Sequence, residues 1–234
     1  YVKLNDIEDI DKLIKNDKQK MIIDILRNNQ QVLKKDIEEI SSASLKTLIN
    51  RGIIIEYKEE IYRLNENIEK KSNNVKLNDA QTKVVSTLKN HLNQFKPFLL
   101  YGVTGSGKTE VYMHIIEEVL KIGKEAIVLV PEISLTPQIV EHFKNRFGNK
   151  IAILHSRLND GERYDEWRKI ERKEVSIVIG ARSAVFAPFT NLGIIIIDEE
   201  HSLTYKQENV PRYHAIDIAL HRAQKHNCPL LLGS

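Results

Sequence analysis

The first 65 residues carry apolar positions first at helical spacing and then at strand spacing. Three stretches with apolar residues three or four positions apart predict helices over residues 17–29, 34–40 and 42–50. The stretches that follow predict two strands joined by a tight turn, namely strands 53–57 and 61–64 with the turn at 58–60. Three helices followed by a hairpin predict a small α+β winged-helix domain over residues 1–65.

Residues 66–76 are rich in Asn, Lys and Glu and have no apolar period, which predicts a linker. From residue 77 onward, apolar runs typical of buried strands alternate with stretches typical of helices. The predicted strands lie at 98–101, 126–130, 151–154, 175–179, 193–197 and from 229 onward. The predicted helices begin at 77 and lie at 109–121, 138–147, 160–169 and 215–224. This alternation predicts an α/β domain over residues 77–234, with a parallel sheet between helices and Trp167 on the inner side of its helix.

The charge and composition of the whole chain do not identify a binding partner. The chain has 234 residues and a net charge of +3, and residues 1–75 carry 14 basic and 14 acidic side chains. Any DNA-binding face must therefore be local. Because no apolar run approaches the roughly 18 residues of a membrane span and no signal-peptide pattern opens the chain, we expect a cytoplasmic protein with no membrane partner. Cys228 is the only cysteine, which excludes a disulfide framework or a cysteine-rich zinc site within these residues.

A glycine-rich turn between the strand at 98–101 and the helix at 109–121 fits the phosphate-loop pattern. Its residues are Gly102, Val103, Thr104, Gly105, Ser106, Gly107, Lys108 and Thr109. Glycines allow backbone N–H groups to turn toward a triphosphate, and the start of the helix points its positive dipole end there. We expect Lys108 to reach the β- and γ-phosphates of ATP as a catalytic residue, and the Thr109 hydroxyl to bind Mg²⁺. The alternative is a Gly- and Ser-rich turn without a ligand.

A second motif, DEEH at residues 198–201, follows the continuous apolar run at 193–197. Such a run is typical of a strand buried on both faces, and its carboxyl end lies where ligands bind in open α/β sheets. We expect Asp198 to hold Mg²⁺ and Glu199 to orient or deprotonate the attacking water, with His201 in the same catalytic set. Considered alone, the motif also fits a solvated acidic turn.

Polar side chains follow three further predicted strands. Because the carboxyl ends of parallel strands meet at one edge of a sheet, we expect these side chains to gather there and to bind the backbone of single-stranded DNA. The expected DNA contacts are Ser134, Thr136, Ser156, Arg182 and Ser183, with His155 beside them. For Thr136 and Ser156, helix capping is an equally open alternative.

Residues 202–214 carry two tyrosines and two cations but no periodic pattern. Aromatic side chains interleaved with cations beside a catalytic carboxylate predict a loop that stacks on the bases of single-stranded DNA. The expected contacts are Tyr205, Lys206, Arg212 and Tyr213. The alternative is a surface loop whose tyrosines pack on the helix at 215–224.

The N-terminal domain fits two roles, DNA contact and docking. Its third predicted helix offers only Lys46 and Arg51 as cations, whereas the hairpin carries Glu56, Glu59 and Glu60. DNA phosphates would repel those carboxylates, so the charge slightly favours a docking or spacer domain.

Six stretches together resemble the PriA family of replication-restart DNA helicases, in helicase superfamily 2. They are GVTGSGKTEVY at 102–112, LVPEISLTPQ at 129–138, LHSRLNDGER at 154–163, GARSAVFAP at 180–188, DEEHSLTYKQ at 198–207 and RYHA at 212–215. The resemblance covers residues 77–234 and implies a RecA-like first helicase lobe preceded by a winged helix. It also implies that Gln81 contacts the adenine of ATP. Ile216 stands where family members commonly have arginine, and Pro211 where some have tryptophan.

The resemblance implies an enzyme that uses ATP and Mg²⁺ to move 3′ to 5′ on DNA at stalled forks and to initiate primosome assembly. The implied partners are single-stranded and forked DNA, replicative-helicase loading proteins and the single-stranded-DNA-binding protein. It places a zinc module and a second lobe with an arginine finger outside these residues. Because such a finger is worth about 10³–10⁵ in rate, we expect this chain alone to hydrolyse ATP poorly.

Other functions fit parts of the sequence. Another superfamily 2 nucleic-acid translocase would share both motifs. A phosphate-loop module that binds nucleotide without catalysis would need the loop but not Glu199. A small-molecule kinase would use the same loop with an arginine-rich lid, which the proline-bracketed loop at 131–137 does not favour.

Overall fold

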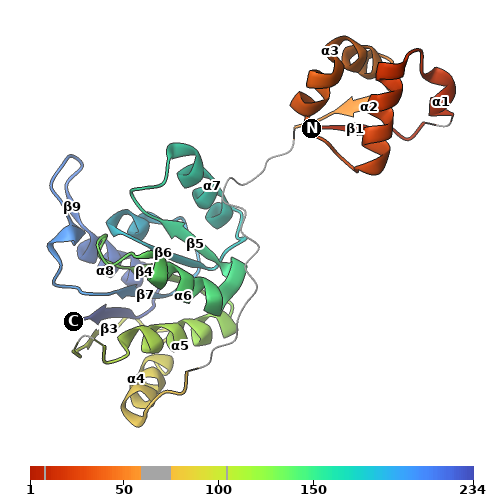
Figure 1. The fold of residues 1–234 in the computed structure, drawn as a ribbon. Coiled ribbons are helices and arrows are strands. Elements are labelled where there is room, and N and C mark those ends of the chain that lie inside the picture. Colours follow the sequence, from red (N-terminus) through yellow and green to blue (C-terminus); the bar gives the residue numbers. More distant parts are fainter. Residues whose placement is uncertain (8, 59–74, 104) are drawn as a thin grey trace. The chain divides into compact units, whose positions relative to one another are not determined.

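The chain folds into two compact units, residues 1–61 and 62–234, each with a hydrophobic core of its own. The computed structural model describes residues 1–7, 9–58, 75–103 and 105–234 (Figure 1). Among the helices in these ranges, none is long and apolar enough to cross a membrane.

The N-terminal unit packs three helices against a two-stranded antiparallel sheet. The helices are α1 (Ile10–Leu13), α2 (Asp17–Asn28) and α3 (Lys34–Asn50), and the strands are β1 (Val2–Leu4) and β2 (Ile54–Glu56). The Asn16 side chain caps α2 by accepting from Gln19 N at 2.9 Å. Ile22, Leu45 and Ile54, one from each main element, are at most 2% exposed in the core.

The predictions for this unit are confirmed in part. The helices expected at 34–40 and 42–50 form the single element α3, which is interrupted at Ser41, where φ is −168° and ψ is 102°. The strand expected at 53–57 is β2, but it pairs with β1, a three-residue strand too short to show a period. Residues 59–60 of the expected turn, the strand at 61–64 and most of the expected linker lie outside the described residues. The winged-helix assignment therefore stays a prediction.

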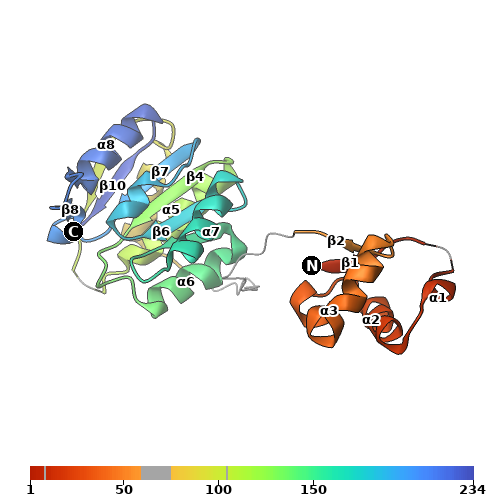
Figure 2. The same cartoon turned by 90° about the horizontal axis from the view of Figure 1, so that it is seen from above.

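The second unit contains a six-stranded parallel sheet, which confirms the predicted α/β fold (Figure 2). Its strands, in spatial order, are β3 (Pro97–Leu100), β10 (Leu230–Gly233), β7 (Leu192–Ile197), β4 (Glu125–Leu129), β6 (Ile177–Gly180) and β5 (Ile151–Leu154). Its helices are α4 (Asp79–Lys89), α5 (Lys108–Lys121), α6 (Pro137–Phe147), α7 (Asp160–Glu171) and α8 (Ala215–Lys225).

Alternate residues of the central strands enter two different core clusters, one on each face of the sheet. Ala126 and Val128 of β4 pack with residues of α4, α5 and α6, whereas Ile127 and Leu129 pack with residues of α8 and with Ile170 of α7. This period of two, with both sets apolar, is what a parallel strand covered on both faces requires. The carboxyl ends of all six strands therefore meet at one edge.

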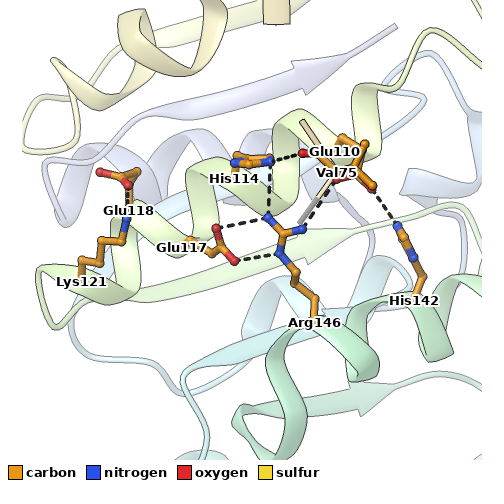
Figure 3. Close-up of polar contacts among 8 residues, drawn as sticks. All are labelled: Val75, Glu110, His114, Glu117, Glu118, Lys121, His142 and Arg146. Atoms are coloured by element: carbon orange, nitrogen blue, oxygen red, sulfur yellow. Dashed lines mark hydrogen bonds and ion pairs between the residues drawn. The ribbon is translucent and has the colours of Figure 1, made fainter. Parts of the chain in front are cut away.

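A buried ion pair fixes α5, the helix that follows the phosphate loop, against α6 (Figure 3). The Arg146 side chain is 4% exposed and donates to both carboxylate oxygens of Glu117, at 2.7 and 3.2 Å. Glu110, which like Glu117 is on α5, has its Oε2 3.9 Å from Arg146 Nη1. Its Oε1 accepts from His142 Nε2 at 3.0 Å. These contacts hold the acidic face of α5 against the basic face of α6.

Replacing Arg146 with leucine should lower the free energy of unfolding by about 2 kcal/mol, because the partly exposed Glu117 carboxylate loses two charge-assisted hydrogen bonds. The double variant Arg146→Leu/Glu117→Leu should regain at least half of that loss. Lys121→Met, which removes a 68% exposed lysine of the same helix, should cost less than about 1 kcal/mol. Urea denaturation measures all three, and a double variant less stable than Arg146→Leu would contradict this account.

Candidate functional site

The phosphate loop begins where β3 ends and stops where α5 begins. Gly105 and Gly107 have φ of +80° and +81°, in the left-handed region that favours glycine. Gly107 is also the N-cap of α5, so the loop passes directly into the helix. The Lys108 ammonium donates to the Gly102 carbonyl across the loop. Thr104, a predicted ATP contact, lies outside the described residues.

One cleft of about 650 Å³, the phosphate-loop cleft, brings the two predicted motifs together. Its lining residues are Tyr101, Gly102, Val103, Gly105, Ser106, Gly107, Lys108, Thr109, Asp198, Glu199, His201 and Ser234. Lys108 and Asp198 share this cleft because only β10 separates β3 from β7 in the sheet. Two strand spacings are about 10 Å, a distance that a bound nucleotide spans. Tyr101 and Ser234 also line the cleft, although the sequence pattern did not indicate them.

Two buried tyrosines orient Asp198. Tyr112 donates from its hydroxyl to Asp198 Oδ1 at 2.9 Å, and Tyr205 donates to the Asp198 carbonyl at 2.6 Å. Burial, together with the negative charge of Asp198, raises the pKa of both phenols, so both stay protonated donors at neutral pH. Tyr112 was not predicted, although its place one helical turn after Lys108 puts both residues on the same face of α5.

Glu199 has a φ of +45°, a left-handed conformation that costs a non-glycine residue about 1–3 kcal/mol. The turn is held because Asp198 N donates to Leu129 O at 2.9 Å and Ser202 N donates to Glu199 O at 2.8 Å. Ser134 lies beside the candidate catalytic carboxylate and donates to Glu199 Oε1 at 3.5 Å, and its contact with DNA stays a prediction. Backbone strain of this kind is characteristic of functional sites.

The donor set of the phosphate-loop cleft fits a nucleotide with Mg²⁺. The loop amides and the Lys108 ammonium suit phosphate oxygens. The Thr109 hydroxyl and the Asp198 carboxylate are hard oxygen ligands of the kind that Mg²⁺ binds. Glu199 and His201 line the same space from the turn that follows β7. These residues would hold ATP and its metal.

Gln81, predicted to contact adenine, supports the phosphate loop from the first turn of α4. Its side-chain oxygen accepts from Asn78 N at 3.0 Å, and its amide nitrogen donates to Ser106 O at 3.1 Å. A Cβ atom at Gly107 would lie 2.5 Å from that nitrogen, so the contact also requires glycine there. The adenine contact itself stays a prediction.

A second cleft, of about 520 Å³, lies near the carboxyl ends of β5 and β6. We call it the tryptophan cleft, and it is lined by Glu132, Leu154, His155, Ser156, Arg163, Trp167, Ala181, Arg182, Ser183, Thr204, Gln207, Pro211 and Tyr213. The sheet thus brings together four of the predicted DNA contacts, Ser156, Arg182, Ser183 and Tyr213. The expectation that Trp167 faces inward is wrong, because its side chain is 37% exposed at this cleft.

Two predicted DNA contacts already have partners in the protein. The Ser156 hydroxyl donates to the Glu132 carboxylate. Thr136 is the N-cap of α6 and accepts from Ile139 N at 3.4 Å, so the capping alternative describes its place in this structure. Whether these hydroxyls also bind DNA stays a prediction.

Residues 203–214 contain a short hairpin. The turn Leu203–Tyr205 leads into β8 (Lys206–Gln207), which pairs with β9 (Tyr213–His214). The Tyr213 ring packs edge-on against Phe186, with centroids 5.0 Å apart. Lys206 and Arg212 are exposed on the hairpin, and Tyr213 is half-buried, so their predicted DNA contacts remain open predictions.

Arg182 anchors this hairpin to the sheet. Its Nη1 donates to the carbonyls on both sides of Tyr205, at 3.0 Å to Thr204 O and also to Lys206 O. The guanidinium carbon lies 6.0 Å from the Tyr213 ring centroid. Arg182 is predicted to bind the DNA backbone, and in the structure its Nη1 already donates to two carbonyls of the protein backbone.

The prediction that Tyr205 stacks on a DNA base is wrong. Its side chain is 0% exposed, and its hydroxyl contacts the carbonyls of Asp198 and, at 3.2 Å, Leu129. The ring completes the core below the hairpin, at the point where β4 and β7 end. An aromatic residue in a polar segment can thus be a core residue, which composition alone does not reveal.

Tyr205→Phe should lower the free energy of unfolding by about 1–3 kcal/mol, because the Asp198 carbonyl loses the Tyr205 hydroxyl as its donor. Tyr101→Phe, at an 84% exposed ring, should change it by less than about 0.5 kcal/mol. Because burial raises the pKa of Tyr205, the native state keeps a proton that the unfolded chain loses above about pH 10. The free energy of unfolding should therefore fall as the pH rises beyond that value. Urea titrations at neutral and alkaline pH measure this free energy for the wild type and both variants. Equal losses for Tyr205→Phe and Tyr101→Phe would contradict it.

Comparison with known proteins agrees with the motifs. The replication restart protein PriA of Bacillus subtilis is 57% identical over 200 residues, which cover 84% of this chain and 25% of that protein. PriA of Haemophilus influenzae is 46% identical over 209 residues, covering 86% of this chain and 28% of that protein. The chain therefore spans about a quarter of the length of the curated relatives it matches.

Among solved structures, RecG bound to a three-way DNA junction is 25% identical over 68% of this chain and 21% of that chain, with a TM-score of 0.49. A family model described as type III restriction enzyme, res subunit, matches residues 74–233. The chain therefore belongs to the family described as type III restriction enzyme, res subunit, and the resemblance to PriA that its motifs predict is confirmed.

Proposed function

We propose that this chain is the ATP-binding lobe, with a preceding winged helix, of a 3′–5′ DNA helicase that restarts replication at stalled forks. The observation that carries the proposal is the phosphate-loop cleft, where Lys108, Thr109, Asp198 and Glu199 line one space at the carboxyl edge of a parallel sheet. The likeness to PriA supports the DNA substrate and the role in replication.

Each residue of the phosphate-loop cleft has a separate role in the proposed ATP hydrolysis. Loop amides and Lys108 would bind the phosphates, and Thr109 and Asp198 would hold Mg²⁺, which when bound would neutralise phosphate charge. Glu199 orients a water and takes its proton as that water attacks the γ-phosphorus. The bond to the bridging oxygen then breaks, which yields ADP and inorganic phosphate. Tyr112 and Tyr205 keep Asp198 in place throughout.

The proposed partners follow from the same assignment. Single-stranded and forked DNA would cross the carboxyl edge of the sheet, where the tryptophan cleft and the exposed cations of the hairpin lie. Replicative-helicase loading proteins and the single-stranded-DNA-binding protein would be the protein partners. Zinc would belong to another part of the full-length protein, because Cys228 is the only cysteine of this chain.

Lys108→Ala should weaken the binding of MgATP to this chain by about 10- to 100-fold, since charge-assisted hydrogen bonds to phosphate are lost. Lys121→Ala, which removes a cation from the far end of the same helix, should leave the affinity unchanged. Isothermal titration calorimetry measures both. Equal affinities for Lys108→Ala and wild type would refute the assignment of the loop.

Glu199→Gln separates a helicase from a module that only binds nucleotide. In a protein extended through the second lobe, the variant should bind MgATP as wild type does and lose at least 100-fold in DNA-stimulated hydrolysis and in unwinding, as expected for a lost general base. Hydrolysis that survives in Glu199→Gln would contradict the role given to this carboxylate.

A further inference from the structure

Trp167, the only tryptophan of the chain, is 37% exposed on α7, whereas other residues of that helix are almost fully buried. Glu166 is 4% exposed and accepts from Ile153 N at 2.8 Å, which ties α7 to β5. Asp165 is 1% exposed and accepts from Arg168 at 3.2 Å. Buried hydrogen bonds of these neighbours hold the helix, and part of the Trp167 surface is open to the tryptophan cleft.

The tryptophan cleft combines the groups that bind a nucleotide of single-stranded nucleic acid. Trp167 and Tyr213 supply aromatic surfaces, Arg163 supplies a positive charge and Ser183 an exposed hydroxyl. Burial, followed by the nearby charge of Arg157, lowers the pKa of His155, so its imidazole is neutral at pH 7. The cleft is large enough for a small ligand.

Charge sets the orientation of a nucleotide in this cleft. Glu132 lines one part of it and would repel a phosphate, but its carboxylate can accept from an N–H group of a base, such as the N3–H of thymine. Arg163 is half-exposed; its Nη2 donates to Leu158 O at 3.3 Å, and its Nη1 lies 3.9 Å from the exposed Asp160 carboxylate, which leaves other guanidinium donors for a phosphate. The phosphate therefore belongs at the rim and the base inside.

We infer that the tryptophan cleft binds one unstacked base of single-stranded DNA, with its ring against the Trp167 indole and its phosphate near Arg163 and Ser183. The inference rests on the proposed function and extends it, because it assigns a base-binding site to a residue outside the motifs. Stacking of a base on an aromatic side chain tolerates any sequence, which suits an enzyme that moves along DNA.

The single tryptophan makes the test direct. Titrating this chain with a short oligothymidylate, without ATP, should quench its intrinsic tryptophan fluorescence and protect it from acrylamide. A phosphodiester strand of the same length without bases should do neither. In fluorescence anisotropy with a labelled oligothymidylate, Trp167→Ala should weaken binding by about 5- to 100-fold, the range for loss of one stacked base. Trp167→Phe should retain most of the affinity.

Tyr164→Ala is the matched control, because Tyr164 is an aromatic residue on the same helix, 61% exposed, that packs beside Arg168 and does not line the cleft. It should change the affinity by less than twofold. Binding that shows in anisotropy but leaves both the tryptophan emission and the affinity of Trp167→Ala unchanged would overturn the inference and leave the helicase proposal standing. No DNA binding by the wild-type chain would overturn the inference and the DNA role proposed for this lobe together.

Discussion

Parallel pairing of β10 with both β3 and β7 is the constraint on which the phosphate-loop cleft depends. Leu230 to Leu232 pair with Ile195 to Ile197 on one side, and residues 230–233 pair with 97–100 on the other. Past the strand ends, Gly102 N donates to Ser234 O at 3.0 Å and Glu200 N donates to Gly233 O at 2.8 Å. One strand thereby fixes the spacing between the loop that carries Lys108 and the turn that carries Asp198.

The same strand explains a glycine requirement at the centre of the site. A Cβ atom at Gly233 would lie 1.9 Å from the Tyr112 hydroxyl oxygen and 3.0 Å from Asp198 Oδ1. The missing side chain leaves the space in which Tyr112 reaches Asp198. The carboxylate proposed to hold Mg²⁺ is thus oriented by a helix, a strand and a buried hydroxyl, all of which are parts of the rigid core.

Tyr205 connects the two clefts through the interior of the lobe. Arg182, which lines the tryptophan cleft, holds the backbone on both sides of Tyr205, and the Tyr205 hydroxyl holds the Asp198 carbonyl. These hydrogen bonds link the hairpin, beside the proposed DNA side, to the turn that carries Glu199, on the proposed ATP side.

The sequence predicted the parts of the fold whose local pattern determines their geometry. The phosphate loop and the DEEH turn were located because glycine conformations and a fully apolar strand leave few alternatives. Tyr205 and Trp167 were assigned to the wrong environments, because the burial of an aromatic residue depends on what else occupies the face. Asp165 and Glu166 took the inner side of α7 by forming buried hydrogen bonds, which no hydrophobic period encodes. β1 is not predicted because three residues are too few to show a strand period.

The central claim is that Lys108 and Asp198 bind opposite sides of one metal–nucleotide complex. A crystal structure of this chain with Mn²⁺ and a non-hydrolysable ATP analogue measures this directly through the anomalous signal of the metal. The account predicts one Mn²⁺ between the Thr109 hydroxyl and Asp198, with the β- and γ-phosphates against the Lys108 ammonium. Mn²⁺ and phosphates bound away from Asp198, or an analogue bound outside the phosphate-loop cleft, would contradict it.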